Sequence, residues 1–350
     1  MKKIFFAVLA LAGLAACSTD EVVSRPQGAA IGFDNVFVEN ATRANALTAN
    51  NLTNFGVYGS VVKVVNGSNQ QGMIFANQEV TGSKDNGYSY SPKQYWIAGA
   101  SYDFVAFAPY QTGANATWTY APAVGTAAEN GTITFDNAKA GANQDFLFAA
   151  TSCNTPDSFT AAPAAVGFIF NHMLSRVKLS FTNGFQSNGN IKLVVKNVHI
   201  TNTAAVGTLA VAKAESATAA AVADDWTTVA TNNNLDVTFG DVEGAAQLAE
   251  NGSGSTTHFY VIPAEREYNI TFDVDLYQAG VLLDTYNRSA KVTVDFTRGM
   301  SYDLKATLNQ TNTSDEGQLY PIEFTVTDVN DWAGFTGVDA NVNQPTTGNN

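Results

Sequence analysis

One cysteine stands where its thiol could be chemically modified. An apolar run at residues 4–16 follows two lysines; it is too short to span a bilayer and is typical of a bacterial export signal. The run ends in Leu14-Ala15-Ala16-Cys17, the pattern in which the thiol receives a diacylglyceryl group and cleavage leaves the cysteine first. Several acyl chains, at about 0.8 kcal/mol per buried CH₂, give a stable anchor. The sequence predicts a lipid on Cys17; the alternative is an ordinary signal with a chance cysteine.

The other polar residues form no catalytic or metal-binding pattern. The three histidines lie far apart, and no HExxH, HxH or CxxC spacing occurs. Adjacent acids at 224–225 and 315–316 lie in polar stretches typical of solvated turns, whereas a glycosidase needs two carboxylates facing each other across a cleft. The stretch 328–332 has two acids but too few ligands for a calcium motif. We therefore expect no metal, no cofactor and no enzymatic activity.

The composition limits the classes of partner that the chain is expected to bind. The chain has 350 residues, a formal net charge of −13 and only 18 basic residues, so we expect no nucleic acid as a partner. Charged residues are only 14% of the chain, which is common in extracellular β-rich proteins. If Cys17 carries lipid, Cys153 has no partner for an intramolecular disulfide and is expected to be a small buried or loop residue.

Almost every apolar stretch repeats with a period of two. In the stretch 101–110, for example, Tyr102, Phe104, Ala106 and Ala108 fall on one face. The alanine-rich stretch 210–225 lacks an apolar stripe and is interpreted as a loop or short helix. Short strands bounded by Gly, Asn, Asp or Pro predict an all-β protein of antiparallel β-sandwiches. The aromatic residues at 95–110 are interpreted as core, with a sugar-binding platform as the alternative.

The chain is long enough for two domains. About 330 residues remain after the signal, and single cores stop growing near 250–300 residues. The stretch 151–165 contains Pro156 and Pro163, is rich in Ser and Thr, and has no apolar period. We expect a linker there, between two sandwiches.

Several stretches together resemble a known family in their residues and in their order along the chain. They are IGFDNVFVENATRA, NFGVYGS, MIFANQEV, YWIAGASYDFVAFAPY, DFLFAAT, FNHMLSRVKLSF, RGMSYDLKATL and FTVTDVNDW. With the signal before them, they resemble the fimbrillin family of Bacteroidetes, the lipoprotein-derived subunits of type V pili and related surface adhesins. The resemblance implies two transthyretin-like antiparallel β-sandwich domains and a location at the outer membrane and cell surface, in a fimbrium.

The resemblance also implies a route of maturation. An Arg-specific surface protease would cut after Arg43 and leave Ala44 first, so that the strand at about 31–40 departs with its lipid. A donor strand of the next subunit would then fill the exposed groove by β-augmentation. The expected plugs of this groove are Ile31, Phe33, Val36 and Val38, with a bulge between Phe33 and Val36. The alternative is a permanent first strand, as in anchor subunits that are not cut.

The candidate donor strand is the C-terminal stretch 332–344. Its few apolar residues are Phe335, Val338 and Val342. The implied division of the chain is a signal peptide at 1–16, a lipidated pro-segment with the first strand at 17–43, an N-terminal sandwich at 44–165 and a C-terminal sandwich with a donor tail at 166–350.

The implied partners are other pilus subunits, the Arg-specific protease, the outer membrane through the lipid anchor, and a host or bacterial surface ligand. The alternative function is a monomeric, tip or accessory surface lipoprotein that binds glycan or host protein.

Overall fold

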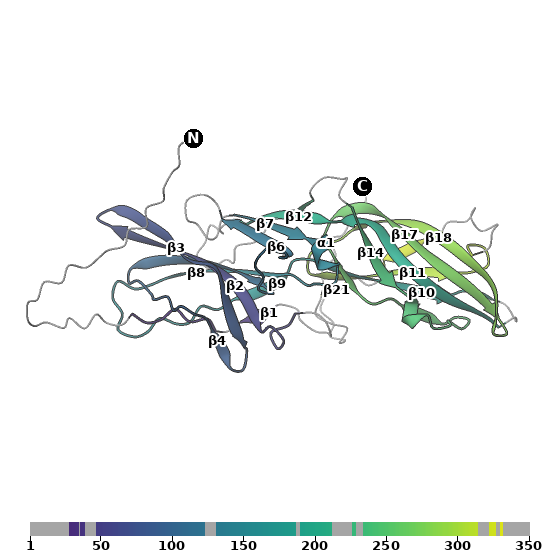
Figure 1. The fold of residues 1–350 in the computed structure, drawn as a ribbon, viewed down its shortest axis with the longest axis horizontal. Coiled ribbons are helices and arrows are strands. Elements are labelled where there is room, and N and C mark those ends of the chain that lie inside the picture. Colours follow the sequence, from purple (N-terminus) through teal and green to yellow (C-terminus); the bar gives the residue numbers. More distant parts are fainter. Residues whose placement is uncertain are drawn as a thin grey trace, which may run out of the picture.

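The structure is a computed structural model, and it is elongated, with the N-terminal half of the chain at one end and the C-terminal half at the other (Figure 1). It describes residues 28–34, 36–38, 47–122, 131–186, 190–211, 226–228, 234–313, 322–326 and 330–331. These residues form strands almost throughout, with one four-residue helix, α1 (Asn137–Ala140), and one 3-10 turn, η1 (Val242–Gly244). The all-β prediction is confirmed. None of the helices described is long and apolar enough to cross a membrane.

A seven-stranded sheet forms the centre of the N-terminal half, in the order β1-β9-β8-β5-β2-β3-β4. Its strands are β1 (Phe37–Val38), β2 (Asn54–Val65), β3 (Ser68–Ser83), β4 (Gly87–Ser89), β5 (Ala100–Ala108), β8 (Leu147–Asn154) and β9 (Ile169–His172). Asn66 and Gly67 join β2 to β3, with φ of 51° and 77°. Both residues must have positive φ in the tight turn that matches strand twist, and Asn-Gly favours it.

A four-stranded sheet, β13-β12-β7-β6, packs on one face of the first sheet. It contains β6 (Trp118–Pro122), β7 (Gly131–Asp136), β12 (Val206–Val211) and β13 (Thr227–Thr228). Strand β7 pairs with β12 over six residues. Backbone from both halves of the chain therefore belongs to one sheet, and the aromatic core beneath it includes Phe107, Trp118, Phe146 and Trp226.

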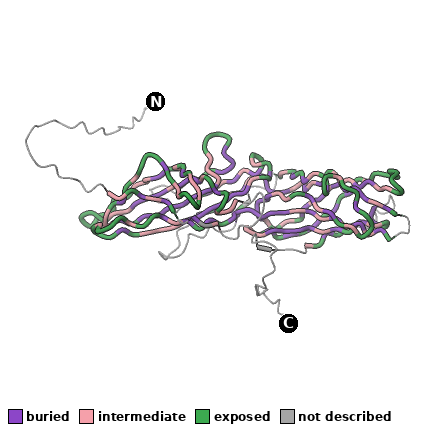
Figure 2. The backbone as a smooth tube through the Cα atoms, turned by 90° about the horizontal axis from the view of Figure 1, so that it is seen from below, coloured by how far each residue is buried: buried purple, intermediate pink, exposed green. Residues whose placement is uncertain are grey.

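Two further sheets form the sandwich of the C-terminal half. One has the order β15-β10-β19-β20, with β16 and β21 at its margins; the other is β14-β11-β17-β18. The first contains β10 (Ser175–Asn183), β15 (Ser253–Ser255), β16 (Phe259–Val261), β19 (Met300–Leu308), β20 (Phe324–Val326) and β21 (Asn330–Asp331). The second contains β11 (Ile191–Ala204), β14 (Asn234–Gly240), β17 (Glu265–Gln278) and β18 (Val281–Asp295). Their inner faces share one apolar core, which runs along the long axis (Figure 2).

One local expectation needs correction. Residues 151–154 are strand rather than linker, because they complete β8 and pair with β5. Leu147 and Phe148 are the residues of β8 that pair with β9; among the described residues the rest of β8 pairs only with β5, and at such an edge Ser and Thr need no apolar alternation.

Strand β9 follows residue 166 in sequence but completes the first sheet. The division of the chain at residues 165 and 166 stays a prediction. The aromatic core interpretation of 95–110 agrees with the burial of Trp96, Tyr102, Phe104 and Phe107, whereas Tyr95 is about half exposed.

A buried asparagine joins three backbone segments of the C-terminal sandwich. The side-chain amide of Asn183 donates to the carbonyls of Ile191 (3.0 Å) and Leu248 (2.9 Å), and its carbonyl accepts from the backbone N–H of Phe185 (3.0 Å). Asn183 is fully buried. Removing its side chain takes one hydrogen bond from each of these groups, although the Leu248 carbonyl still accepts from the Leu193 N–H.

We predict that Asn183→Ala lowers the free energy of unfolding by about 3 kcal/mol, measured by urea denaturation, because each orphaned buried group costs roughly 1–3 kcal/mol. The matched control is Asn86→Ala, at an exposed turn where the amide reaches only Ser83 Oγ. This control should change stability by less than about 0.5 kcal/mol. Equal effects from the two variants would contradict the assignment.

Candidate functional site

The N-terminal segment at 28–38 lies along the first sandwich and pairs with a loop on one of its sides. Its Ile31 N–H donates to the Gln94 carbonyl (2.8 Å), and the Trp96 N–H donates to the Ala29 carbonyl (3.0 Å). The Tyr90 hydroxyl also donates to the Ile31 carbonyl (2.8 Å). Burial raises the pKa of Tyr90, so the phenol stays protonated and able to donate.

The same segment pairs on its other side with the chain that leads into β9. The Val166 N–H donates to the Gly32 carbonyl (2.8 Å), and the Asp34 N–H donates to the Val166 carbonyl (3.0 Å). Three residues later β1 pairs in parallel with Ile169 and Phe170 of β9. The segment is therefore bonded on both sides, so its departure would leave unpaired backbone groups on two separate edges.

Phe33 is the largest buried side chain among those described in the segment. It is 2% exposed, and its ring lies 5.4–6.3 Å, between centroids, from five other aromatic rings. Those rings are Phe55, Phe75, Tyr90, Phe104 and Phe168. Burying such a ring stabilises the fold by roughly 1.5–3 kcal/mol from area alone, with aromatic contacts adding to it.

Ile31 and Val36 are also buried, at 1% and 2% exposure, and Val38 is half-buried. All of them join Phe33 in the core of the first sandwich. The spacing from 31 to 33 is that of a strand, whereas 33 to 36 breaks it. The bulge predicted between Phe33 and Val36 falls around residue 35, which lies outside the described residues.

A buried contact between a carboxyl group and an imidazole holds the chain on the other side of the candidate cleavage stretch. The Leu47 N–H donates to Asp145 Oδ2 (3.0 Å), and the same oxygen lies 3.0 Å from His172 Nδ1. Both ionisable side chains are almost fully buried, at 1% and 2% exposure. We call Asp145, His172 and the Leu47 N–H the clasp. No sequence pattern predicted the clasp, since Asp145 and His172 lie 27 residues apart.

Strand β9 contacts the residues that come before and after the stretch 39–46 in the sequence. Its first two residues pair with Phe37 and Val38, and its last residue, His172, belongs to the clasp that receives Leu47. The stretch therefore starts and ends against one short strand. The predicted cleavage residues Arg43 and Ala44 lie within it, outside the described residues.

The remaining predicted residues are not described either. The lipidation site Cys17 and the donor residues Phe335, Val338 and Val342 lie outside the described ranges. The last described strand, β21, pairs with Met300 and Ser301 at the start of β19. Gly299 in turn donates to the Leu174 carbonyl, two residues after β9. The last described strand thus lies near the middle of the molecule (Figure 1).

Two further expectations concern chemistry. Cys153 lies in β8 and is half-buried; burial, helped by the charge of Asp103, raises the pKa of its thiol to about 11. At neutral pH this thiol is protonated and therefore a poor nucleophile. Within the ranges given above, no group of three or more His, Cys, Asp or Glu side chains could hold a metal ion.

Known proteins resemble the chain to different degrees. A solved structure of a proposed cell adhesion protein from Bacteroides ovatus has 16% identity and a TM-score of 0.45, covering 89% of this chain and 99% of its own. One from Bacteroides uniformis has 16% identity and a TM-score of 0.45, covering 87% and 98%. The fimbrial anchor protein Mfa2 from Porphyromonas gingivalis has 9% identity and a TM-score of 0.38, covering 86% and 96%. A comparison with curated proteins finds no match.

A family model matches most of the chain. The model is described as fimbrillin-like, and the match runs over residues 42–332. It starts within the stretch between β1 and the clasp, includes both sandwiches and ends one residue after β21. The chain belongs to the fimbrillin-like family.

Proposed function

We propose that this protein is a structural subunit of a type V-like pilus at the cell surface that supports adhesion. It is exported as a lipoprotein precursor, anchored in the outer membrane through Cys17, cut after Arg43 and polymerised by donor-strand exchange. The observation that carries the proposal is the position of the N-terminal segment. This segment supplies Phe33 to the centre of an aromatic core, although its covalent link to the rest of the fold runs only through the stretch 39–46.

Cutting that stretch would turn a covalent part of the core into a removable one. Departure of the segment exposes the rings around Phe33 and frees backbone groups of Gln94, Trp96 and Val166. Buried groups of this kind are costly to leave without partners. An extended strand from a second copy restores both the backbone bonds and the apolar plugs, which is the physical basis of β-augmentation.

The clasp gives the cut chain a defined new end. Cleavage after Arg43 would place the new amine only three residues before Leu47, whose N–H is bonded to Asp145. The residues after the cut would then stay on the first sandwich while those before it leave. This supports release of the first strand alone, without unravelling of β2.

The donor would be the C-terminal stretch 332–344. It follows β21, and the 19 residues after Asp331 extend at most about 63 Å at roughly 3.3 Å per residue. That length exceeds what a strand of the size of 31–38 needs. Other subunits and an Arg-specific surface protease are the implied partners, and a host or bacterial surface ligand would be met by the assembled fibre.

The first test is controlled cleavage. We expect an Arg-specific protease to release residues up to 43 from the purified precursor, and we expect the trimmed protein to form fibres visible by electron microscopy. Arg43→Ala is the matched control and should stay monomeric under the same treatment. A trimmed protein that stays monomeric would contradict the pilus subunit. It would favour a monomeric or tip adhesin, for which a glycan array is the next measurement.

The second test concerns the plug. Phe33→Ala should lower the free energy of unfolding of the uncut precursor by about 3–5 kcal/mol, because it leaves a cavity among five rings. Asp34→Ala is the matched control, since its side chain is exposed and its backbone bond to Val166 remains. Guanidinium denaturation measures both. A small effect of Phe33→Ala would show that the segment is not a structural plug.

The third test concerns the clasp. Asp145→Ala removes one partner of a buried pair, so we expect a loss of about 3–5 kcal/mol and faster hydrogen exchange at the Leu47 amide. Asp236→Ala is the matched control: its pair with His199 has a similar 3.1 Å separation but lies on the surface. That variant should change stability by less than about 1 kcal/mol. Unchanged exchange at Leu47 in Asp145→Ala would remove the clasp from the proposal.

A further inference from the structure

Exposed large apolar side chains gather at the two ends of the molecule. Among the described residues, three of them lie at the tip of the β17–β18 hairpin and four at the outer end of the first sandwich, while Ile169 lies between. We call the four the outer patch; they are Val64, Val65, Tyr95 and Ile97, at 61%, 42%, 48% and 41% exposure. Single exposed apolar side chains are ordinary, whereas a group of them can mark a surface that meets a partner or a lipid.

The outer patch comes from two neighbouring parts of the first sheet. Its two valines end β2, and Tyr95 and Ile97 lie in the loop before β5. Lys63, near the end of β2, pairs with Ala100, the first residue of β5. The Lys63 Nζ also donates to the Ala98 carbonyl (2.8 Å), so the loop is held against the end of β2.

This end of the first sheet points away from the second sandwich. The other end of β5, at Ala108, pairs with Leu147 of β8, and Leu147 pairs with His172. His172 ends β9, and β10 of the second sandwich begins three residues later. The outer patch therefore lies at the far end of the first sandwich (Figure 1).

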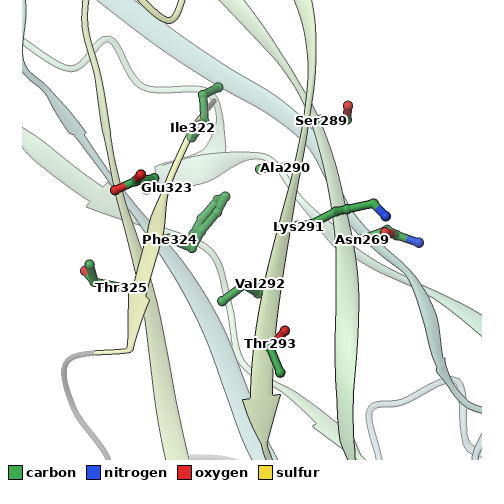
Figure 3. A pocket seen from close by; sticks show the side chains of 10 residues that line it. All are labelled: Asn269, Ser289, Ala290, Lys291, Val292, Thr293, Ile322, Glu323, Phe324 and Thr325. Carbon is green, nitrogen blue, oxygen red and sulfur yellow. The ribbon is translucent and has the colours of Figure 1, made fainter. Parts of the chain in front are cut away.

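The groove between β18 and β20 is not a comparable apolar surface. Its apolar lining residues are Ala290, Val292, Ile322 and Phe324, and each is only 5–8% exposed. Figure 3 shows the side chains of Val292 and Phe324 directed towards each other, as parts of the sandwich core. Apart from Ile169, the exposed large apolar side chains of the described chain are thus confined to its two ends.

The N-terminal segment enters the fold at the outer patch. Ala30 pairs with Tyr95, and the Ala29 carbonyl accepts from the Trp96 N–H. The described part of the segment begins at Gly28, which follows Cys17 by 11 residues. A chain of this length reaches at most about 40 Å. A lipid on Cys17 therefore keeps the outer patch close to the membrane surface.

We propose that the outer patch rests on the lipid surface that holds the anchor, so that the uncut precursor stands end-on on the membrane. The inference rests on the proposed anchor at Cys17 and adds a second point of contact to it. Two membrane signals hold a protein more firmly than one. The tether makes a contact of four side chains effective, because it raises their local concentration at the bilayer.

The residues at this end suit the interface of a bilayer. Tyrosine is favoured there, because its ring is apolar and its hydroxyl can meet water. Lys63 and Lys93 adjoin the patch in sequence, and Asp157 lies against Gly99. Two lysines and one acid reverse the balance of the whole chain, which has 18 basic and 31 acidic residues. This local balance favours an approach to anionic headgroups.

An end-on position leaves the cleavage stretch clear of the membrane. The segment runs from Ala30 at the patch to Val38, which pairs with Phe170 of β9. The extended chain between Ala30 and Val38 spans about 26 Å. The stretch 39–46 therefore begins well away from the lipid surface, where a protease can reach it.

Quenching by a labelled lipid tests the inference on the uncut chain from residue 18. A hexahistidine tag replaces Cys17 and binds a nickel-chelating lipid in vesicles of phosphatidylcholine and phosphatidylglycerol. In a Cys153→Ser background, a fluorophore is attached to Ile97→Cys, and we expect a spin-labelled lipid in the same vesicles to quench its emission. Leu283→Cys is the matched control, because Leu283 is also about half exposed but lies at the opposite end. Its emission should be unchanged.

A second label guards against a local effect at residue 97. The fluorophore is attached to Val65→Cys, and quenching is compared with and without the pair Tyr95→Ser and Ile97→Ser. Loss of these apolar side chains should reduce the quenching, because it weakens the contact with lipid. The pair Val281→Ser and Leu282→Ser is the matched control and should leave the quenching unchanged. Equal effects of the two pairs would overturn the inference.

The pattern of quenching decides what the outer patch meets. Quenching at residue 97 but not at 283 supports the inference, whereas equal quenching at both ends, or none at residue 97, overturns it. An emission shift that appears without vesicles and grows with protein concentration would assign the patch to a second copy and also overturn it. Because the tag replaces the natural lipid, an unmodified Cys17 in cells would contradict the proposed anchor without changing this measurement. An unquenched label would leave the pilus proposal intact.

Discussion

The first sandwich depends on one aromatic ring that its own sheets do not provide. Phe33 lies within ring contact of five aromatic side chains drawn from β2, β3, β5 and two flanking loops. Protein interiors are close-packed, so a void of this size is a substantial loss of stability. The N-terminal segment fills it and pairs its backbone on two sides. An otherwise complete fold is thus held together by a segment that a single cut would detach.

The edges of the β-sheets are the second feature on which the structure depends. A strand edge is a hazard because it can pair with any other chain, and the N-terminal segment covers one such pair of edges in the first sandwich.

Local pattern was sufficient for much of the fold but not for its long-range contacts. Period-two alternation identified the strands and the inward faces of Tyr102 and Phe104, because alternation directly reflects which side of a sheet is buried. The family resemblance, and not alternation, singled out Ile31, Phe33 and Val36, which the structure buries. Alternation did not predict the β7–β12 pairing or the Asp145–His172 contact, since both join residues that are far apart in the sequence. Residues 151–154 were wrongly predicted to be a linker, because a strand at the edge of a sheet can be polar.

The short pairing of β21 with the start of β19 has a mechanical meaning. If subunits are joined through the segment after Asp331, a pull along the fibre enters each molecule near its middle. The load then passes into the first sandwich by way of β19, Leu174 and β9, while the outer end of the second sandwich bears no tension. The tip of the β17–β18 hairpin lies at that end, with exposed side chains of Val281, Leu282 and Leu283. It would carry no load, so substitutions in it would not weaken the fibre.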